Sequence, residues 1–160
     1  MGLFDFFKKK NNQQPSVNQN DSTDDFVKDM IKSADFFVKN HSARFKGLDY
    51  SVKSLQVVDD FLDEASDFFE EMNLNQQQSI TNTVGAYIFE VARRNYGGKY
   101  FWYDHLKQPI LVTGQPEFEV SILAIEKVKG RLINGNEDNI PFYFQGFIEN
   151  VQNKKSAMIV

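Results

Sequence analysis

SITNTVGAYIFEVARRNYGGKYFWY, residues 79–103, is the stretch that decides the fold class of this chain. Its first part carries apolar side chains at spacings of three and four, which predicts a buried helix; these are Ile80, Val84, Tyr87, Ile88 and Val91. Gly97 and Gly98 predict the end of that helix, because glycine enters the left-handed region without a Cβ clash. The aromatic run at 99–103 then favours a β-strand. This order predicts a helix packed on a sheet.

Helical periodicity is also present on both sides of this stretch. Apolar spacing predicts one helix over residues 22–39 and a second over residues 51–72, which residues 73–78 connect to the helix at 79. Downstream, short apolar segments at 109–113 and 117–120 predict two more strands, with a turn at 114–116 between them. Two further helices are predicted over residues 121–134 and 139–151.

The short connections between the three strands predict an antiparallel meander, because parallel pairing needs a crossover of about a dozen residues or more. A length of 160 residues suits one domain. We therefore expect a single α+β domain at residues 23–151, with helices packed on one face of a small antiparallel three-stranded sheet. Residues 1–22 are expected to form a flexible N-terminal tail, and residues 152–160 a C-terminal tail.

Composition narrows the classes of function. The formal net charge of −4 argues against general nucleic-acid binding, which needs a basic surface. The absence of cysteine excludes disulfides, thiolate catalysis and cysteine-ligated zinc. No apolar run approaches the roughly 18 residues of a membrane-spanning helix, and the first residues do not follow the order of a secretory signal. We therefore expect a cytoplasmic protein, and the sequence predicts no cofactor and no metal.

The first ten residues, MGLFDFFKKK, are separated from the domain by a polar stretch with almost nothing to bury. Four apolar residues followed by three lysines can lie on an anionic membrane surface, with the lysines at the headgroups. These residues are Leu3, Phe4, Phe6, Phe7, Lys8, Lys9 and Lys10. A terminus that is frayed or loosely docked explains the same pattern, and both interpretations stay open at this point.

The most acidic surface is predicted on the outer face of the helix at 51–72. Its carboxylates are Asp59, Asp60, Asp63, Glu64, Asp67, Glu70 and Glu71. Four of them, Asp60, Asp63, Asp67 and Glu71, recur at spacings of three and four and so point in one direction. A charge run of this kind commonly forms a solvated face, but it can also steer a basic protein partner. These four residues are the candidate partner-binding site.

Glu90 is the carboxylate with the most distinctive neighbours. Arg93 and Arg94 follow it at spacings of three and four, which predicts ion pairs within one helix. A half-buried Glu90 near Trp102 is also a candidate acid or base, because burial can raise the pKa of a carboxyl group. Glu90, Arg93 and Trp102 therefore define a possible pocket.

The two histidines, His41 and His105, do not have the spacing of a metal-binding pair. His105 follows the aromatic strand and is predicted to be a surface-loop residue. A hydrolase that uses Glu90 or His105 is the least favoured of the function classes that we consider.

Several short motifs lie between residues 48 and 148. They are Leu48-Asp49-Tyr50-Ser51 with Ser54-Leu55 and Val58-Asp59, Gly85-Ala86-Tyr87 with Glu90-Val91, Gly97-Gly98 before an aromatic residue, and residues 128–135 with Glu137-Asp138. Together they resemble a group of small uncharacterised bacterial proteins. The resemblance includes no catalytic motif, and it implies a compact acidic protein of the kind that neutralises toxins.

On these grounds we expect a non-enzymatic protein-binding module, and the resemblance implies an immunity-like, toxin-neutralising role for it. The alternative is a peripheral membrane-associated accessory protein that is tethered by the N-terminal peptide.

Overall fold

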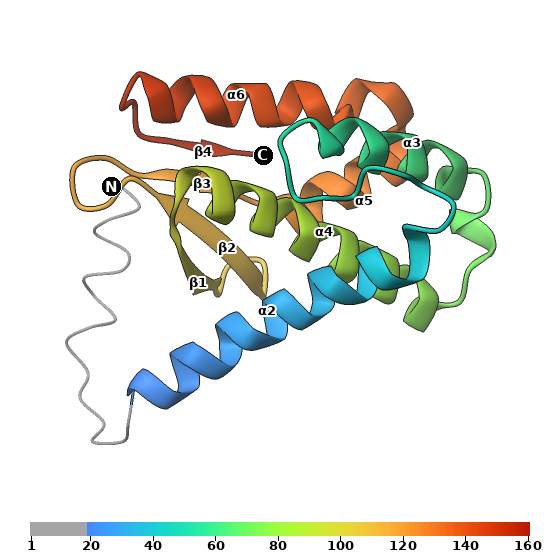
Figure 1. The fold of residues 1–160 in the computed structure, drawn as a ribbon, viewed down its shortest axis with the longest axis horizontal. Coiled ribbons are helices and arrows are strands. Elements are labelled where there is room, and N and C mark those ends of the chain that lie inside the picture. The colour runs from blue at the N-terminus through green and yellow to red at the C-terminus, as the bar shows by residue number, and fades with distance from the viewer. Residues whose placement is uncertain (1–18) are drawn as a thin grey trace.

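The computed structural model describes residues 19–160, with side chains from Asp24 onward (Figure 1). The N-terminal peptide, for which membrane contact is predicted at residues 3–10, lies outside the described residues. The elements are α2 (Gln19–His41), α3 (Ser54–Ser66), η1 (Phe69–Glu71), α4 (Leu74–Tyr96), β1 (Lys99–Tyr103), β2 (Gln108–Thr113), β3 (Val120–Ile122), α5 (Ala124–Asn134), η2 (Gly135–Asp138), α6 (Ile140–Gln152) and β4 (Ala157–Ile159). The fold is therefore α+β, as predicted.

The sheet has four strands in the order β1-β2-β3-β4. The antiparallel pairing of β1 with β2 and of β2 with β3 agrees with the predicted meander. The prediction of three antiparallel strands is nevertheless wrong, because β4 pairs with β3 in parallel. Residues 157–159, which the prediction assigned to a C-terminal tail, form β4, and the helices α5 and α6 supply the crossover that a parallel pair requires.

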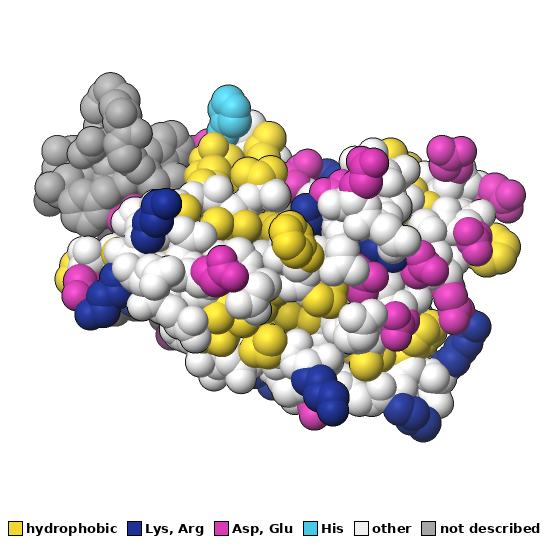
Figure 2. Space-filling view, turned by 90° about the horizontal axis from the view of Figure 1, so that it is seen from above, with side chains coloured by type: hydrophobic (Ala, Val, Ile, Leu, Met, Phe, Trp, Pro, Cys, Tyr) yellow, Lys and Arg dark blue, Asp and Glu magenta, His cyan; other side chains and the backbone are white. Residues whose placement is uncertain are grey.

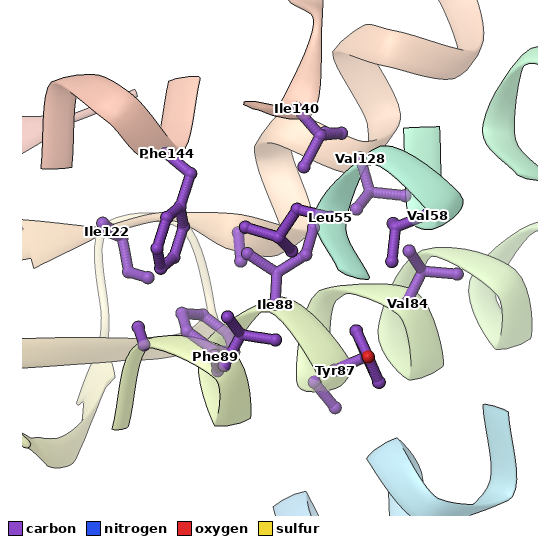
Figure 3. Close-up of a cluster of buried hydrophobic side chains, with 14 of the residues drawn as sticks. Leu55, Val58, Val84, Tyr87, Ile88, Phe89, Ile122, Val128, Ile140 and Phe144 are labelled. Carbon is purple, nitrogen blue, oxygen red and sulfur yellow. The ribbon is translucent and has the colours of Figure 1, made fainter. Parts of the chain in front are cut away.

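The centre of α4 forms the middle of the core. Residues 84–92 are all buried, and α4 packs against α2, α5 and β2 (Figure 3). Gly85 permits the close approach of α5, because a Cβ at this position would lie 2.7 Å from Cγ1 and 3.2 Å from Cα of Ile125. Figure 3 shows Ile88 and Phe89 of α4 beneath side chains from α3, β3 and α6. The stretch that predicts the fold class is therefore the centre of the structure.

Three predicted helix boundaries shift for local reasons. Helix α4 begins at Leu74, before the predicted Ser79, because Asn73 and Gln76 form a capping box. Helix α3 ends at Ser66, where i→i−3 backbone bonds tighten the chain toward η1, and it does not continue to residue 72. Helix α5 begins at Ala124, because residues 121 and 122 pair with β2.

The alternation of side chains along the strands gives the sheet two apolar faces. Tyr100, Leu111, Val120 and Ile122 face the helices and belong to the main core. The opposite face, called the outer sheet face below, carries a separate cluster made of Phe101, Tyr103, Ile110, Val112, Leu123 and Met158. Within residues 19–160, each helix is too short or too polar to span a bilayer.

We predict that Gly98 is less tolerant of substitution than Gly97. Both have positive φ, +77° at Gly97 and +134° at Gly98, but a Cβ at Gly97 would meet nothing within 4 Å. At Gly98 it would lie 2.8 Å from Thr113 Oγ1 and 3.0 Å from the Val112 carbonyl oxygen. In urea unfolding, Gly97→Ala should cost about 1 kcal/mol and Gly98→Ala about 2–3 kcal/mol. Equal losses would contradict this assignment of the helix-to-strand junction.

Candidate functional site

Glu90 is held at the end of α4 by a set of charged and polar partners. Its fully buried side chain accepts hydrogen bonds from Arg93 at 2.6 and 2.9 Å and from Arg94 at 3.2 Å. The Tyr100 hydroxyl, on β1, donates to Glu90 Oε2 at 2.8 Å. The ion pairs predicted from the helical spacing are thus present, and Tyr100 adds a link from α4 to the sheet.

These partners keep Glu90 ionised. Burial alone would raise the pKa of its carboxyl group, but the hydrogen bonds from Arg93 and Tyr100 and the two arginine charges outweigh burial and lower this pKa below 4.5. Burial, together with the adjacent Glu90 carboxylate, raises the pKa of Tyr100. A carboxylate in this state is an acceptor at neutral pH, and it has no proton to give as a general acid.

Trp102 does not join the Glu90 cluster. Within residues 24–160, the polar contacts of Glu90 are with Arg93, Arg94 and Tyr100 and do not include Trp102. Trp102 lies two residues after Tyr100 on β1, and its side chain is exposed. Of the predicted pocket residues, the structure therefore brings together Glu90 and Arg93, while Trp102 lies on the surface.

A second buried ion pair, between Arg131 on α5 and Asp59 on α3, was missed by sequence reasoning. Arg131 is 1% exposed, and its Nε and Nη2 lie 2.9 and 3.2 Å from the two carboxylate oxygens of Asp59. Nη2 also donates to Asp63 Oδ1 at 3.0 Å and to Asn136 Oδ1 at 3.1 Å. Asp59 in turn accepts the backbone N–H of Ile140 at the start of α6, at 2.9 Å. The pair therefore ties α3 to α5, η2 and α6.

The position of Asp59 corrects the predicted outer face of α3. Asp59 is buried, although the acidic run placed it with the solvated carboxylates. Asp59 lies four residues after Leu55 and three before Leu62, which puts it on the apolar stripe of the helix. This spacing could have predicted its burial from the sequence. Nothing local pointed to Arg131, because 72 residues separate the two partners.

The predicted partner-binding residues are exposed but differ in their contacts. Asp63 forms an ion pair with Arg131 and is therefore partly neutralised. Asp60 accepts a hydrogen bond from the Gln56 side chain. Asp67 and Glu71 are exposed and have no ion pair with a residue of the described chain. We call Asp60, Asp63, Asp67 and Glu71 the acidic surface; Figure 2 shows Asp and Glu side chains gathered at the end of the molecule where α3 and η1 lie.

A hollow of about 360 Å³ adjoins the acidic surface. One wall consists of Ser66, Asp67, Glu70 and Glu71, and the other of residues 132–135 at the end of α5. Large apolar side chains are exposed beside these carboxylates: Phe68, next to Asp67 in the chain, is 61% exposed, and Ile133 in the second wall is 67% exposed. This region therefore combines negative charge, apolar area and a concave shape.

The two histidines lie apart from these clusters. His41 packs against the rings of Phe37 and Phe61, with centroid distances of 5.2 and 4.5 Å, and burial lowers its pKa. His105 lies in the turn between β1 and β2 and is exposed, as predicted. Among the described residues, no group of three or more His, Cys, Asp or Glu side chains could hold a metal ion.

Comparison with protein-family models, curated proteins and solved structures gave no match for this chain.

We predict that the stability contributed by Glu90 depends on pH. Its folded-state pKa is lowered, so the contribution is present above the ordinary pKa of 4.5 and is lost as the pH falls through the folded-state value. At pH 7, Glu90→Gln should reduce the free energy of unfolding by about 2–4 kcal/mol, because it leaves two partly exposed arginines without their counter-charge. The difference between wild type and variant should shrink below pH 4.5 in urea unfolding. A loss that is constant from pH 7 to pH 3, or equal to that of the exposed control Glu70→Gln, would contradict the ion-pair role.

We also predict strong coupling between Asp59 and Arg131. Either Asp59→Asn or Arg131→Met alone should cost about 3–5 kcal/mol, because each leaves a buried charge without its partner. The double variant should cost less than the sum of the single losses by about 1–3 kcal/mol. Chemical denaturation of all four proteins measures this interaction energy. Additive losses would mean that the two side chains stabilise the fold independently.

Proposed function

We propose that this chain is a non-enzymatic protein-binding module that binds a basic protein through its acidic surface. The observation that carries the proposal is the pair of exposed carboxylates Asp67 and Glu71, which have no ion-pair partner in the described chain and lie beside the hollow. Uncompensated negative charge of this kind accelerates association with a positively charged partner.

The exposed apolar side chains support a stable interface with the partner, in addition to its electrostatic attraction. Interfaces commonly place aromatic and aliphatic anchors within a polar rim, and charged groups around such anchors give specificity. Phe68 and Ile133 supply apolar area next to the carboxylates. The hollow between η1 and the end of α5 offers space for a projecting side chain, for which a lysine or arginine has the complementary charge.

The state of Glu90 supports a binding role over acid–base catalysis. Two arginines and Tyr100 satisfy its carboxylate, and its pKa is lowered, whereas a general acid at neutral pH needs a raised pKa. The motifs between residues 48 and 148 imply a toxin-neutralising protein by resemblance. A basic toxin is accordingly the class of partner that we propose.

We predict that reversing the charges of Asp67 and Glu71 weakens partner binding without loss of the fold. Asp67→Lys with Glu71→Lys should leave the thermal midpoint nearly unchanged, because exposed charges contribute little to stability. Asp63 is kept, since its reversal would place a lysine against Arg131. Binding should weaken by about tenfold or more, chiefly through slower association that becomes less sensitive to salt. The measurement is affinity capture from native-cell lysate, followed by association kinetics with the recovered protein at low and high salt.

The matched control is Asp24→Lys with Asp29→Lys on α2, which changes the net charge by the same amount at exposed positions away from the hollow. The proposal requires that the control binds like wild type. Equal rates and equal salt dependence for all three proteins would show that the acidic surface is only a solvated face. The proposal would also be rejected if affinity capture recovers no protein that binds to the wild type but not to the reversed variant.

A further inference from the structure

The outer sheet face lies away from the helices that pack on the sheet. Helices α4 and α6 contact the sheet through the main core, to which Tyr100, Leu111 and Ile122 belong. On the outer side, Ile110 and Val112 are 0% and 1% exposed and form a cluster of their own with Leu123. An apolar sheet face is stable in water only when another layer covers it, and residues 19–160 place their helices on the opposite side.

Two buried polar atoms on the same face also lack a hydrogen-bond partner within the described part of the chain. Gln108 pairs with Tyr103 and Ser121 pairs with Val112 in the strand registers, so both side chains belong to the outer sheet face. Gln108 Oε1 and Ser121 Oγ are buried and make no hydrogen bond with any residue that the structure describes. Both can accept a hydrogen bond, so a covering segment that brings N–H groups fits this face better than a purely apolar surface does.

We propose that residues 3–7, the apolar part of the N-terminal peptide, cover the outer sheet face of the same chain. Leu3, Phe4, Phe6 and Phe7 supply the apolar side chains, and the peptide backbone supplies N–H donors. This proposal does not depend on the protein-binding role of the acidic surface, which lies at the α3 and η1 end of the molecule.

The course of the chain places this peptide within reach. Phe26, the eighth residue of α2, packs edge-on against Tyr100 with ring centroids 6.0 Å apart, so this part of α2 lies beside β1. Strand β1 is the edge of the sheet, and the outer sheet face begins on its other side. Residues 8–18 can span up to about 36–40 Å when extended, which is enough to pass around this edge.

Charge favours the same placement. Lys8, Lys9 and Lys10 follow the apolar residues directly, and the rest of the chain is acidic enough to give a net charge of −4. With the aromatic residues on the face, the lysines lie close to its margin, where the negative charge of the rest of the chain attracts them.

The test uses the full chain and exploits its lack of cysteine. A nitroxide spin label on Asp5→Cys should broaden the methyl resonances of Ile110, Val112 and Met158 strongly, with the loss of most of their intensity. The methyl groups of Val58 and Val84, in the helical part of the core, should keep theirs. A matched variant that also carries Phe4→Ser, Phe6→Ser and Phe7→Ser should lose the broadening, because the apolar side chains that hold the label in place are gone.

Two further samples separate the other possible occupants of this face. The first sample mixes two preparations: chain that carries the spin label but no isotope, and chain that carries the isotope but no cysteine. This mixture should show no broadening. Broadening would mean that a second copy covers the face, and it would overturn the proposal. Anionic vesicles of phosphatidylglycerol and phosphatidylcholine should leave the broadening in the chain labelled at Asp5→Cys unchanged. The proposal would also be overturned if the chain labelled at Asp5→Cys shows no broadening on its own, or if it loses the broadening when vesicles bind. The second of these outcomes would favour the membrane-tethered alternative.

Discussion

Residues 84–92 of α4 are buried on all sides, and a helix buried in this way needs neighbouring elements on every side. The chain supplies them with α2 along one flank, α5 at the close crossing over Gly85, and the sheet beyond. The glycines at the end of α4 then turn the chain directly into β1, so that helix and sheet share one core. The remaining elements lie where they cover a part of α4 or of the sheet that α4 contacts (Figure 1).

Glu90 and Asp59 are the most deeply buried carboxylates of the described residues, and the fold provides each of them with an arginine. Glu90 finds Arg93 and Arg94 on its own helix, so the spacing in the sequence was enough to predict the contact. Asp59 finds Arg131 on a helix 72 residues away, and only the assembled core brings the two together. Local ion pairs can be predicted from helical periodicity, whereas long-range pairs depend on packing that a single sequence does not specify.

The same distinction explains what could be predicted of the sheet. The aromatic run of β1 and the apolar run of β2 are long enough to show a β preference, and short connections give antiparallel pairing. Strand β4 has three residues, Ala157–Ile159, and no periodicity can be read from so few. Its pairing with β3 depends on the return of α6, whose Tyr143 donates to the Ile159 carbonyl at 3.0 Å and accepts the Leu123 N–H at 3.1 Å.

The buried network also affects the candidate binding surface. Arg131 is adjacent in sequence to the wall of the hollow at residues 132–135, and it holds Asp59 and Asp63 of α3, the helix that leads into the opposite wall. The two walls are therefore joined beneath the surface by charge-assisted hydrogen bonds. A surface whose backbone is fixed in this way loses little conformational entropy when a partner binds. Carboxylates therefore have two roles in helix α3. Those on its inner side fix the position of the helix, and those on its outer side remain in solvent, where a partner can reach them.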